Sequence, residues 1–197
     1  MNRKESYSLV LLAGGKSSRM GSNKAELMFE GKTFTQVLLE KAQKMGMEHI
    51  VISGYEEEGF LTVWDIYPEM GPLGGLHACM NAIETPYCLV LPVDVPQIPV
   101  ELLEDLIDFH ETSTEKQLPV LLKHGDRREN LIGIYPAEMK NFIEERIKAK
   151  RLSAHSMLDT WGHQCVECEV SDWQVDNINT RENYEELLRL AKRGNPC

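Results

Sequence analysis

Short apolar runs alternate with amphipathic stretches along most of this 197-residue chain, and this alternation restricts the fold more than any other feature. Residues 8–13, 49–53 and 87–91 are nearly continuous in apolar side chains, which is typical of strands buried on both faces. Stretches with helical periodicity lie between them. We therefore expect an α/β fold with three layers, in which a mostly parallel, Rossmann-like sheet carries helices on both faces.

The same patterns place the remaining elements. Pro136 suits the first position of a helix, because its missing N–H costs nothing there. No break in composition divides the chain, so we expect one domain over residues 1–197 with a polar tail at 192–197. Further strands are expected at residues 61–64, 118–122, 130–135 and 164–170, and helices at residues 35–44, 76–83, 100–109, 136–148 and 181–191.

Composition excludes several classes of function. The formal net charge of −10 argues against a nucleic-acid partner, which normally requires a basic face. No apolar run approaches the roughly 20 residues that cross a bilayer, so we expect no membrane association. The five cysteines are an odd number, and the N-terminus shows no secretory pattern. We therefore expect reduced thiols and a cytoplasmic protein.

A glycine-rich, cationic stretch, LAGGKSSRMGSNK at residues 12–24, follows the first apolar run. Glycines such as Gly14 and Gly15 allow the backbone to approach a ligand closely, and consecutive N–H groups can then bind an anion. Lys16, Arg19 and Lys24 add positive charge. The spacing fits neither the nucleotide P-loop nor the dinucleotide-binding fingerprint. A glycine turn with solvated cations remains the alternative.

Two further loops follow predicted strands. Asp65 and the sequence GPLGGL at residues 71–76 come after the third strand, where the start of a helix favours anions. Asp94 stands between two prolines directly after the long apolar run at 87–91. A carboxylate held on such a stiff segment can ligate Mg²⁺, which shares oxygen ligands with substrate phosphates. The alternatives are a tight connection for the first loop and an ordinary turn for the second.

The sequence DNINT at residues 176–180 follows the last predicted strand. Thr180 suits the N-cap of the final helix, and Asp176, Asn177 and Asn179 are expected to face the same crevice as the earlier loops. In open α/β sheets ligands bind in the crevice outside the carboxyl ends of the strands. All four stretches are therefore expected to meet there.

Taken in this order, the four stretches resemble one family, the molybdenum cofactor guanylyltransferases called MobA. Its opening pattern L-A-G-G-x-S-x-R-M-G-x-x-K is present in full, followed by G-P-L-G-G-L with Asp65 upstream. Its P-x-D-x-P turn is present around Asp94, and its N-x-N-T motif ends at Thr180. Val93 stands where members often carry Cys, and Arg181 stands where they usually carry Pro. The matches span nearly the whole chain.

The resemblance implies a nucleotidyltransferase fold and transfer of GMP from GTP to the terminal phosphate of molybdopterin, which forms the guanine dinucleotide and pyrophosphate. It implies that Lys24 reaches the nucleotide phosphates, that Asp65 helps hold the nucleoside and that Asp94 ligates Mg²⁺. Arg19 and Lys24 are then expected to stabilise the charge on the leaving pyrophosphate. The implied partners are GTP, molybdopterin or the molybdenum cofactor, and other proteins of its biosynthesis. The resemblance also implies that the backbone contacts the nucleotide at Leu12, Ala13, Gly14 and Gly15.

Several interpretations remain open. The catalyst could instead be a cytidylyltransferase acting on the same cofactor, an enzyme acting on a sugar or polyol phosphate, or a non-catalytic nucleotide-binding regulator. Arg127 and Arg128 in the sequence HGDRREN either meet the pterin phosphate or belong to a hairpin turn with surface charges. Cys165 and Cys168 form only half of a zinc motif, and a strand through them points them to opposite faces, so ordinary thiols are expected.

Overall fold

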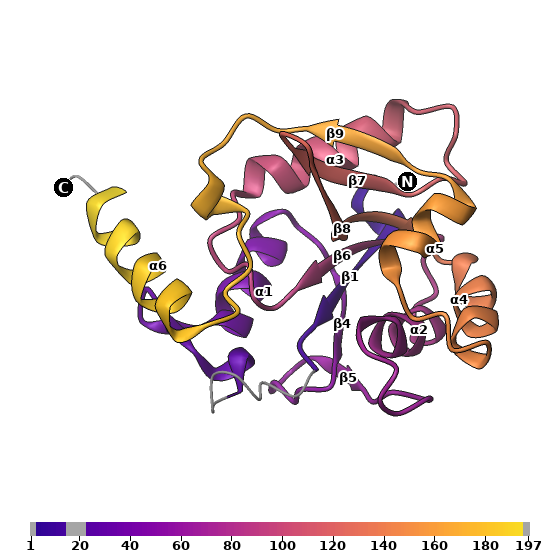
Figure 1. Ribbon diagram of the computed structural model, residues 1–197, viewed down its shortest axis with the longest axis horizontal. Helices are drawn as coiled ribbons and strands as arrows, with labels where there is room; N and C mark the ends of the chain where they lie inside the picture. The colour runs from indigo at the N-terminus through magenta and orange to yellow at the C-terminus, as the bar shows by residue number, and fades with distance from the viewer. Residues whose placement is uncertain (1–2, 15–22, 195–197) are drawn as a thin grey trace.

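A seven-stranded sheet forms the centre of the protein, whose computed structural model describes residues 3–14 and 23–194 (Figure 1). Its first four strands are mutually parallel, whereas the fifth, β8, runs antiparallel to both of its neighbours, and the last strand is parallel to β7. The strand order is β5 (Leu61–Val63), β4 (His49–Ser53), β1 (Tyr7–Leu12), β6 (Tyr87–Pro92), β8 (Arg127–Pro136), β7 (Val120–His124) and β9 (Gln164–Glu167).

Helices cover both faces of this sheet, which confirms the three-layer α/β architecture. Two hydrophobic cores lie on the two sides, and alternate residues of β1 contribute to each of them: Leu9 and Leu11 to one, Val10 and Leu12 to the other. The first core packs under α1 (Phe34–Lys44), α3 (Val100–Thr112) and α6 (Arg181–Gly194), and the second under α2 (Pro72–Ala82), α4 (Met139–Lys148) and α5 (Ala154–Trp161).

Smaller elements complete the chain. Thr33 and Gln36 form a capping box that starts α1, because the hydroxyl of Thr33 accepts from the N–H of Gln36 while the Gln36 amide accepts from the N–H of Thr33. None of the helices in the described ranges is both long and apolar enough to span a bilayer. The small elements are β2 (Met28–Phe29) and β3 (Lys32–Thr33), which pair with each other, and the 3₁₀ turns Arg3–Ser6, Lys24–Glu26 and Asp172–Gln174.

Three boundaries differ from those expected. Pro136 does not open a helix: it is the last residue of β8, paired with Tyr87, and α4 begins at Met139. The GPLGG sequence is not a loop before the second helix, because α2 already begins at Pro72. Helix α5 was not expected at all; the hydroxyl of Ser153 caps it by accepting from the N–H of Ser156.

Candidate active site

A cavity of about 480 Å³ lies at the carboxyl ends of β1 and β6. Residues that follow these two strands form one side of it, and the first half of β8 forms another. Strand β8 reaches this edge because it runs antiparallel to β6, which brings its beginning to the end of β6. The lining comprises Leu12, Ala13, Gly14, Lys24, Pro72, Pro92, Val93, Asp94, Glu129, Asn130, Leu131, Ile132, Ala154, His155, Asn177 and Asn179.

Backbone hydrogen bonds hold the loops at the carboxyl ends of the strands. The N–H of Ala13 donates to the carbonyl oxygen of Ser53 at 3.1 Å, and the N–H of Val93 donates to that of Leu12 at 3.0 Å. These bonds continue the parallel pairing past the strand ends. Gly14 then lies against Gly54, where a Cβ would be only 2.6 Å from the Cα of Gly14. The backbone next to the cavity is therefore closely packed.

Lys24, Asp94 and Asn179 meet in this cavity. The ammonium of Lys24 lies 2.8 Å from Oδ2 of Asp94 and donates to Oδ1 of Asn179 at 2.6 Å. The side chains of Lys24 and Asp94 are 18% and 17% exposed, so the ion pair is largely shielded from water. The N–H of Ile178 also donates to the carbonyl oxygen of Asp94 at 2.8 Å. Three segments that are far apart in the sequence are therefore joined at Lys24 and Asp94.

The oxygen atoms around Asp94 fit a hard divalent cation. Oδ1 of Asp94 is buried and finds no hydrogen-bond partner within residues 3–14 and 23–194. Asn177 and Asn179 line the same cavity. No group of three acidic, histidine or cysteine side chains in the described ranges could hold a metal. Mg²⁺ commonly uses only one or two carboxylates and takes its other oxygens from phosphates and water, so Asp94 suits it.

Lys41 on α1 stabilises the loop that carries Asp94. Its ammonium donates to the carbonyl oxygens of Pro96 and Ile98, each at 2.6 Å, and joins α1 to this loop. Burial lowers the pKa of Lys41 to about 8, and Glu30 and Glu101 oppose part of that shift.

Glu129 is a cavity residue that the sequence did not predict. It is 8% exposed, and burial raises the pKa of its carboxyl group, while the neighbouring Arg127 counteracts part of that rise. Nε of Arg127 lies 2.5 Å from Oε1 of Glu129, and its Nη1 lies 2.7 Å from Oδ1 of Asp176. Asp176 is thus held by Arg127 and, unlike Asn177 and Asn179, does not line the cavity. Only the antiparallel direction of β8 could have indicated Glu129.

Asp65 lies beside the cavity. Its carboxylate packs against the first turn of α2, where a Cβ on Gly74 would lie 2.8 Å from Oδ2 of Asp65. Burial raises the pKa of this carboxyl group. Pro72, the first residue of the same helix, lines the cavity. The contact of Asp65 with the nucleoside stays a prediction.

The remaining predicted residues have different outcomes. Gly15 and Arg19 lie outside the described residues, as does Lys16. The predicted N-cap of the final helix is confirmed, because the N–H of Asn183 donates to the hydroxyl of Thr180 at 3.2 Å. Residues 124 and 127 pair across a two-residue turn, so HGDRREN forms a hairpin, but Arg128 is only 12% exposed and is not the surface charge that this interpretation expected. Cys165 packs against one core and Cys168 belongs to the other.

Comparison with known proteins agrees with this geometry. The family model described as "MobA-like NTP transferase domain" matches residues 9–165. A molybdenum cofactor guanylyltransferase from Xanthomonas euvesicatoria is 36% identical, over 91% of this chain and 93% of its own length. A probable molybdenum cofactor guanylyltransferase from Clostridium perfringens is 33% identical, over 92% of this chain and 96% of its own length.

A solved structure has the same fold. The crystal structure of molybdopterin-guanine dinucleotide biosynthesis protein A from Archaeoglobus fulgidus superposes with a TM-score of 0.76 at 22% identity. The match covers 94% of this chain and 99% of the other. All four ordered sequence stretches contribute residues to the lining of one cavity. Together with the extent of these matches, this leads to one conclusion: the chain belongs to the MobA-like NTP transferase domain family.

Proposed function

We propose that the protein transfers GMP from GTP to the terminal phosphate of molybdopterin, or of the molybdenum cofactor, and releases pyrophosphate. The observation that carries this proposal is the junction of Lys24, Asp94 and Asn179 in one cavity. It supplies one cation for phosphate oxygens and one carboxylate with a buried, unpaired oxygen for a metal. The names of the full-length relatives support the same substrate pair.

The nucleotide occupies the side of the cavity formed by the loop after β1. Backbone groups of Leu12, Ala13, Gly14 and Gly15 contact it, as the opening motif implies. Lys24 and Arg19 neutralise its phosphates, and Asp65 contributes to holding the nucleoside from beside α2. Gly14 lines the cavity while Gly54 and Ser53 pack where its side chain would be, so this part of the loop is held close to the second strand of the sheet.

The reaction needs no nucleophile from the protein. An oxygen of the acceptor phosphate attacks the α-phosphorus of GTP, a new P–O bond forms, and the bond to the β-phosphate oxygen breaks in line with it. The protein therefore contributes by aligning the two substrates and by neutralising charge. Lys24 stabilises the leaving pyrophosphate from its place beside Asp94. When Mg²⁺ is bound at Asp94, it supplies Lewis-acid charge neutralisation on the phosphate oxygens.

The proposal is tested by incubating the protein with GTP, Mg²⁺ and molybdopterin and measuring the guanine dinucleotide and pyrophosphate. Parallel reactions with CTP, ATP and UTP separate guanylyl transfer from cytidylyl transfer. A sugar phosphate and a polyol phosphate replace molybdopterin in two further reactions. Transfer to either of these acceptors, or preference for CTP, contradicts the proposal. Tight binding of GTP without transfer to any acceptor favours the non-catalytic regulator.

Two broader expectations belong to the same proposal. We expect the reaction to occur in the cytoplasm, where cysteine thiols stay reduced. We also expect the product or the acceptor to pass between this protein and other proteins of molybdenum cofactor biosynthesis. Co-purification from cells that make the cofactor tests the second expectation.

A further inference from the structure

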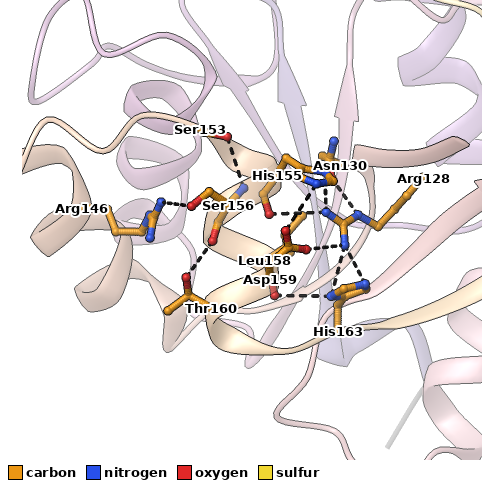
Figure 2. Close-up of polar contacts among 10 residues, drawn as sticks. All are labelled: Arg128, Asn130, Arg146, Ser153, His155, Ser156, Leu158, Asp159, Thr160 and His163. Carbon is orange, nitrogen blue, oxygen red and sulfur yellow. Dashed lines mark hydrogen bonds and ion pairs between the residues drawn. The ribbon is translucent and has the colours of Figure 1, made fainter.

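Arg128 lies behind the cavity at the centre of a polar network (Figure 2). Its side chain is only 12% exposed. The Nε–H donates to Oδ1 of Asn130 at 2.9 Å, and Nη1 donates to Oδ1 of Asp159 at 2.9 Å. Nη1 also lies 2.7 Å from Nε2 of His163, and Nη2 lies 2.7 Å from Nδ1 of His155. The guanidinium therefore joins β8, α5 and the turn after α5.

This network fixes part of the cavity wall. Asn130 and His155, both bound by Arg128, line the cavity, whereas Asp159 and His163 do not. His155 is the second residue of α5, and Ala154 before it also lines the cavity. Arg128 is thus absent from the cavity surface but determines where two of its side chains lie. With so many protein partners, it is not placed to bind the acceptor phosphate itself.

The contacts also determine which ring nitrogens of the two histidines face Arg128. A guanidinium has only donors, so Nδ1 of His155 and Nε2 of His163 accept from it. Nε2 of His155 lies 3.3 Å from Oδ2 of Asp159. Nδ1 of His163 lies 3.3 Å from the carbonyl oxygen of Leu158 and 3.4 Å from Nη1 of Arg128. Both rings are thus held on two sides.

Asp159 and Cys165 are two further titratable groups near Arg128. Asp159 already accepts from Arg128, and this hydrogen bond lowers the pKa of Asp159. Cys165 on β9 also faces the guanidinium electrostatically, and burial raises the pKa of its thiol, which keeps it neutral. Asp159 therefore lies against both the guanidinium and the ring of His155 and links the two.

We propose that Arg128 is a positioning residue for the acceptor, holding Asn130 and His155 in place as the part of the cavity wall that the acceptor contacts. The inference rests on the proposed function, in which GTP fills the side formed by the loop after β1. The acceptor must share the cavity and bring its phosphate to Asp94, and the wall carrying Asn130 and His155 is the one left for it.

Steady-state kinetics of Arg128→Met and Arg128→Lys test the proposal. We expect KM for molybdopterin to rise about tenfold or more in both variants, while KM for GTP and kcat stay within about twofold. Lysine does not rescue, because a single ammonium cannot span the acceptors that the planar guanidinium joins. Arg189→Met, at a half-exposed residue of α6, is the matched control and leaves both KM values unchanged. Equal rises in the two KM values overturn the proposal.

The outcomes separate this inference from the proposed function. Wild-type protein without GMP transfer contradicts the proposed function. In that case equilibrium dialysis of molybdopterin against wild-type and Arg128→Met protein still tests Arg128, and equal Kd values overturn its role. Thermal unfolding of each variant identifies any that is unfolded at the assay temperature. If Arg128→Met is unfolded, Arg128→Lys decides.

Discussion

The ammonium of Lys24 lies 2.8 Å from Oδ2 of Asp94, although the two residues are 70 positions apart in the chain. The pair joins the end of the glycine-rich loop to the segment after β6 at the cavity. Because both side chains are more than four-fifths shielded, neither charge is fully solvated. Removing one partner of such a pair leaves the other charge poorly compensated.

Asp94→Ala is expected to abolish GMP transfer while the protein stays folded. The substitution removes both the oxygen that faces Lys24 and the buried oxygen that is available to a metal. Pyrophosphate release in Mg²⁺ measures the effect, and circular dichroism checks the fold. Asp105→Ala, at an exposed residue of α3, is the control with normal turnover. Full turnover of Asp94→Ala would remove the proposed metal role.

Lys24→Ala is expected to lower kcat/KM about a hundredfold, or by about 3 kcal/mol, which is the scale for losing one charge-stabilising donor. Asp94 would also lose its counter-charge, so the affinity for Mg²⁺ without nucleotide should not fall. Lys32→Ala, which breaks an exposed ion pair with Glu40, is the matched control. A change in kcat/KM of less than about twofold would show that Lys24 takes no part in catalysis.

Gly54→Ala is expected to raise KM for GTP. Gly54 has φ of +71°, and an added Cβ would lie 2.6 Å from the Cα of Gly14, so the backbone of the nucleotide loop must move. The left-handed conformation alone costs a non-glycine residue about 1–2 kcal/mol. Gly59→Ala separates the two effects, because Gly59 has φ of +86° with no atom within 4 Å of the added Cβ. Both variants lose stability in urea, but only Gly54→Ala changes KM; equal KM values contradict the close approach.

Lys41 gives a pH dependence of stability. Its pKa is about 8 in the folded protein and has the ordinary value of 10.5 when unfolded. Between these values the unfolded chain binds more protons, so the free energy of unfolding rises with pH. We expect the difference in unfolding free energy between wild type and Lys41→Met to grow by about 2 kcal/mol from pH 8 to pH 10 in urea titrations. A constant difference would show that the Lys41 pKa is not lowered.

The sequence predicted the parallel half of the sheet well. Strands β1, β4 and β6 are buried on both faces, and this burial produces the continuous apolar runs that identify them. The sequence also predicted one common site for Leu12, Gly14, Asp94 and Asn179, because loops after parallel strands share one edge of the sheet. That the chain forms one domain, and what each site residue does, stay predictions.

The other half was harder to predict, for a physical reason. Apolar periodicity contains no information on strand direction, so the antiparallel course of β8, and with it the place of Glu129, could not be foreseen. Helix α5 is only eight residues long and has two buried apolar side chains, too few for a clear helical period. His155 therefore had no predicted partner, although Ser153 three residues before Ser156 was an available cap signal.

The reversal of β8 brings a later stretch of the chain to the cavity beside the residues up to Asp94. The wall with Asn130 and His155 comes from residues 129–155, and Asn177 and Asn179 add a third stretch. The residues proposed to meet the acceptor are thus different from those proposed to hold the nucleotide. Substitutions in residues 129–155 can therefore change the preference for one acceptor over another while the residues of the nucleotide side stay the same.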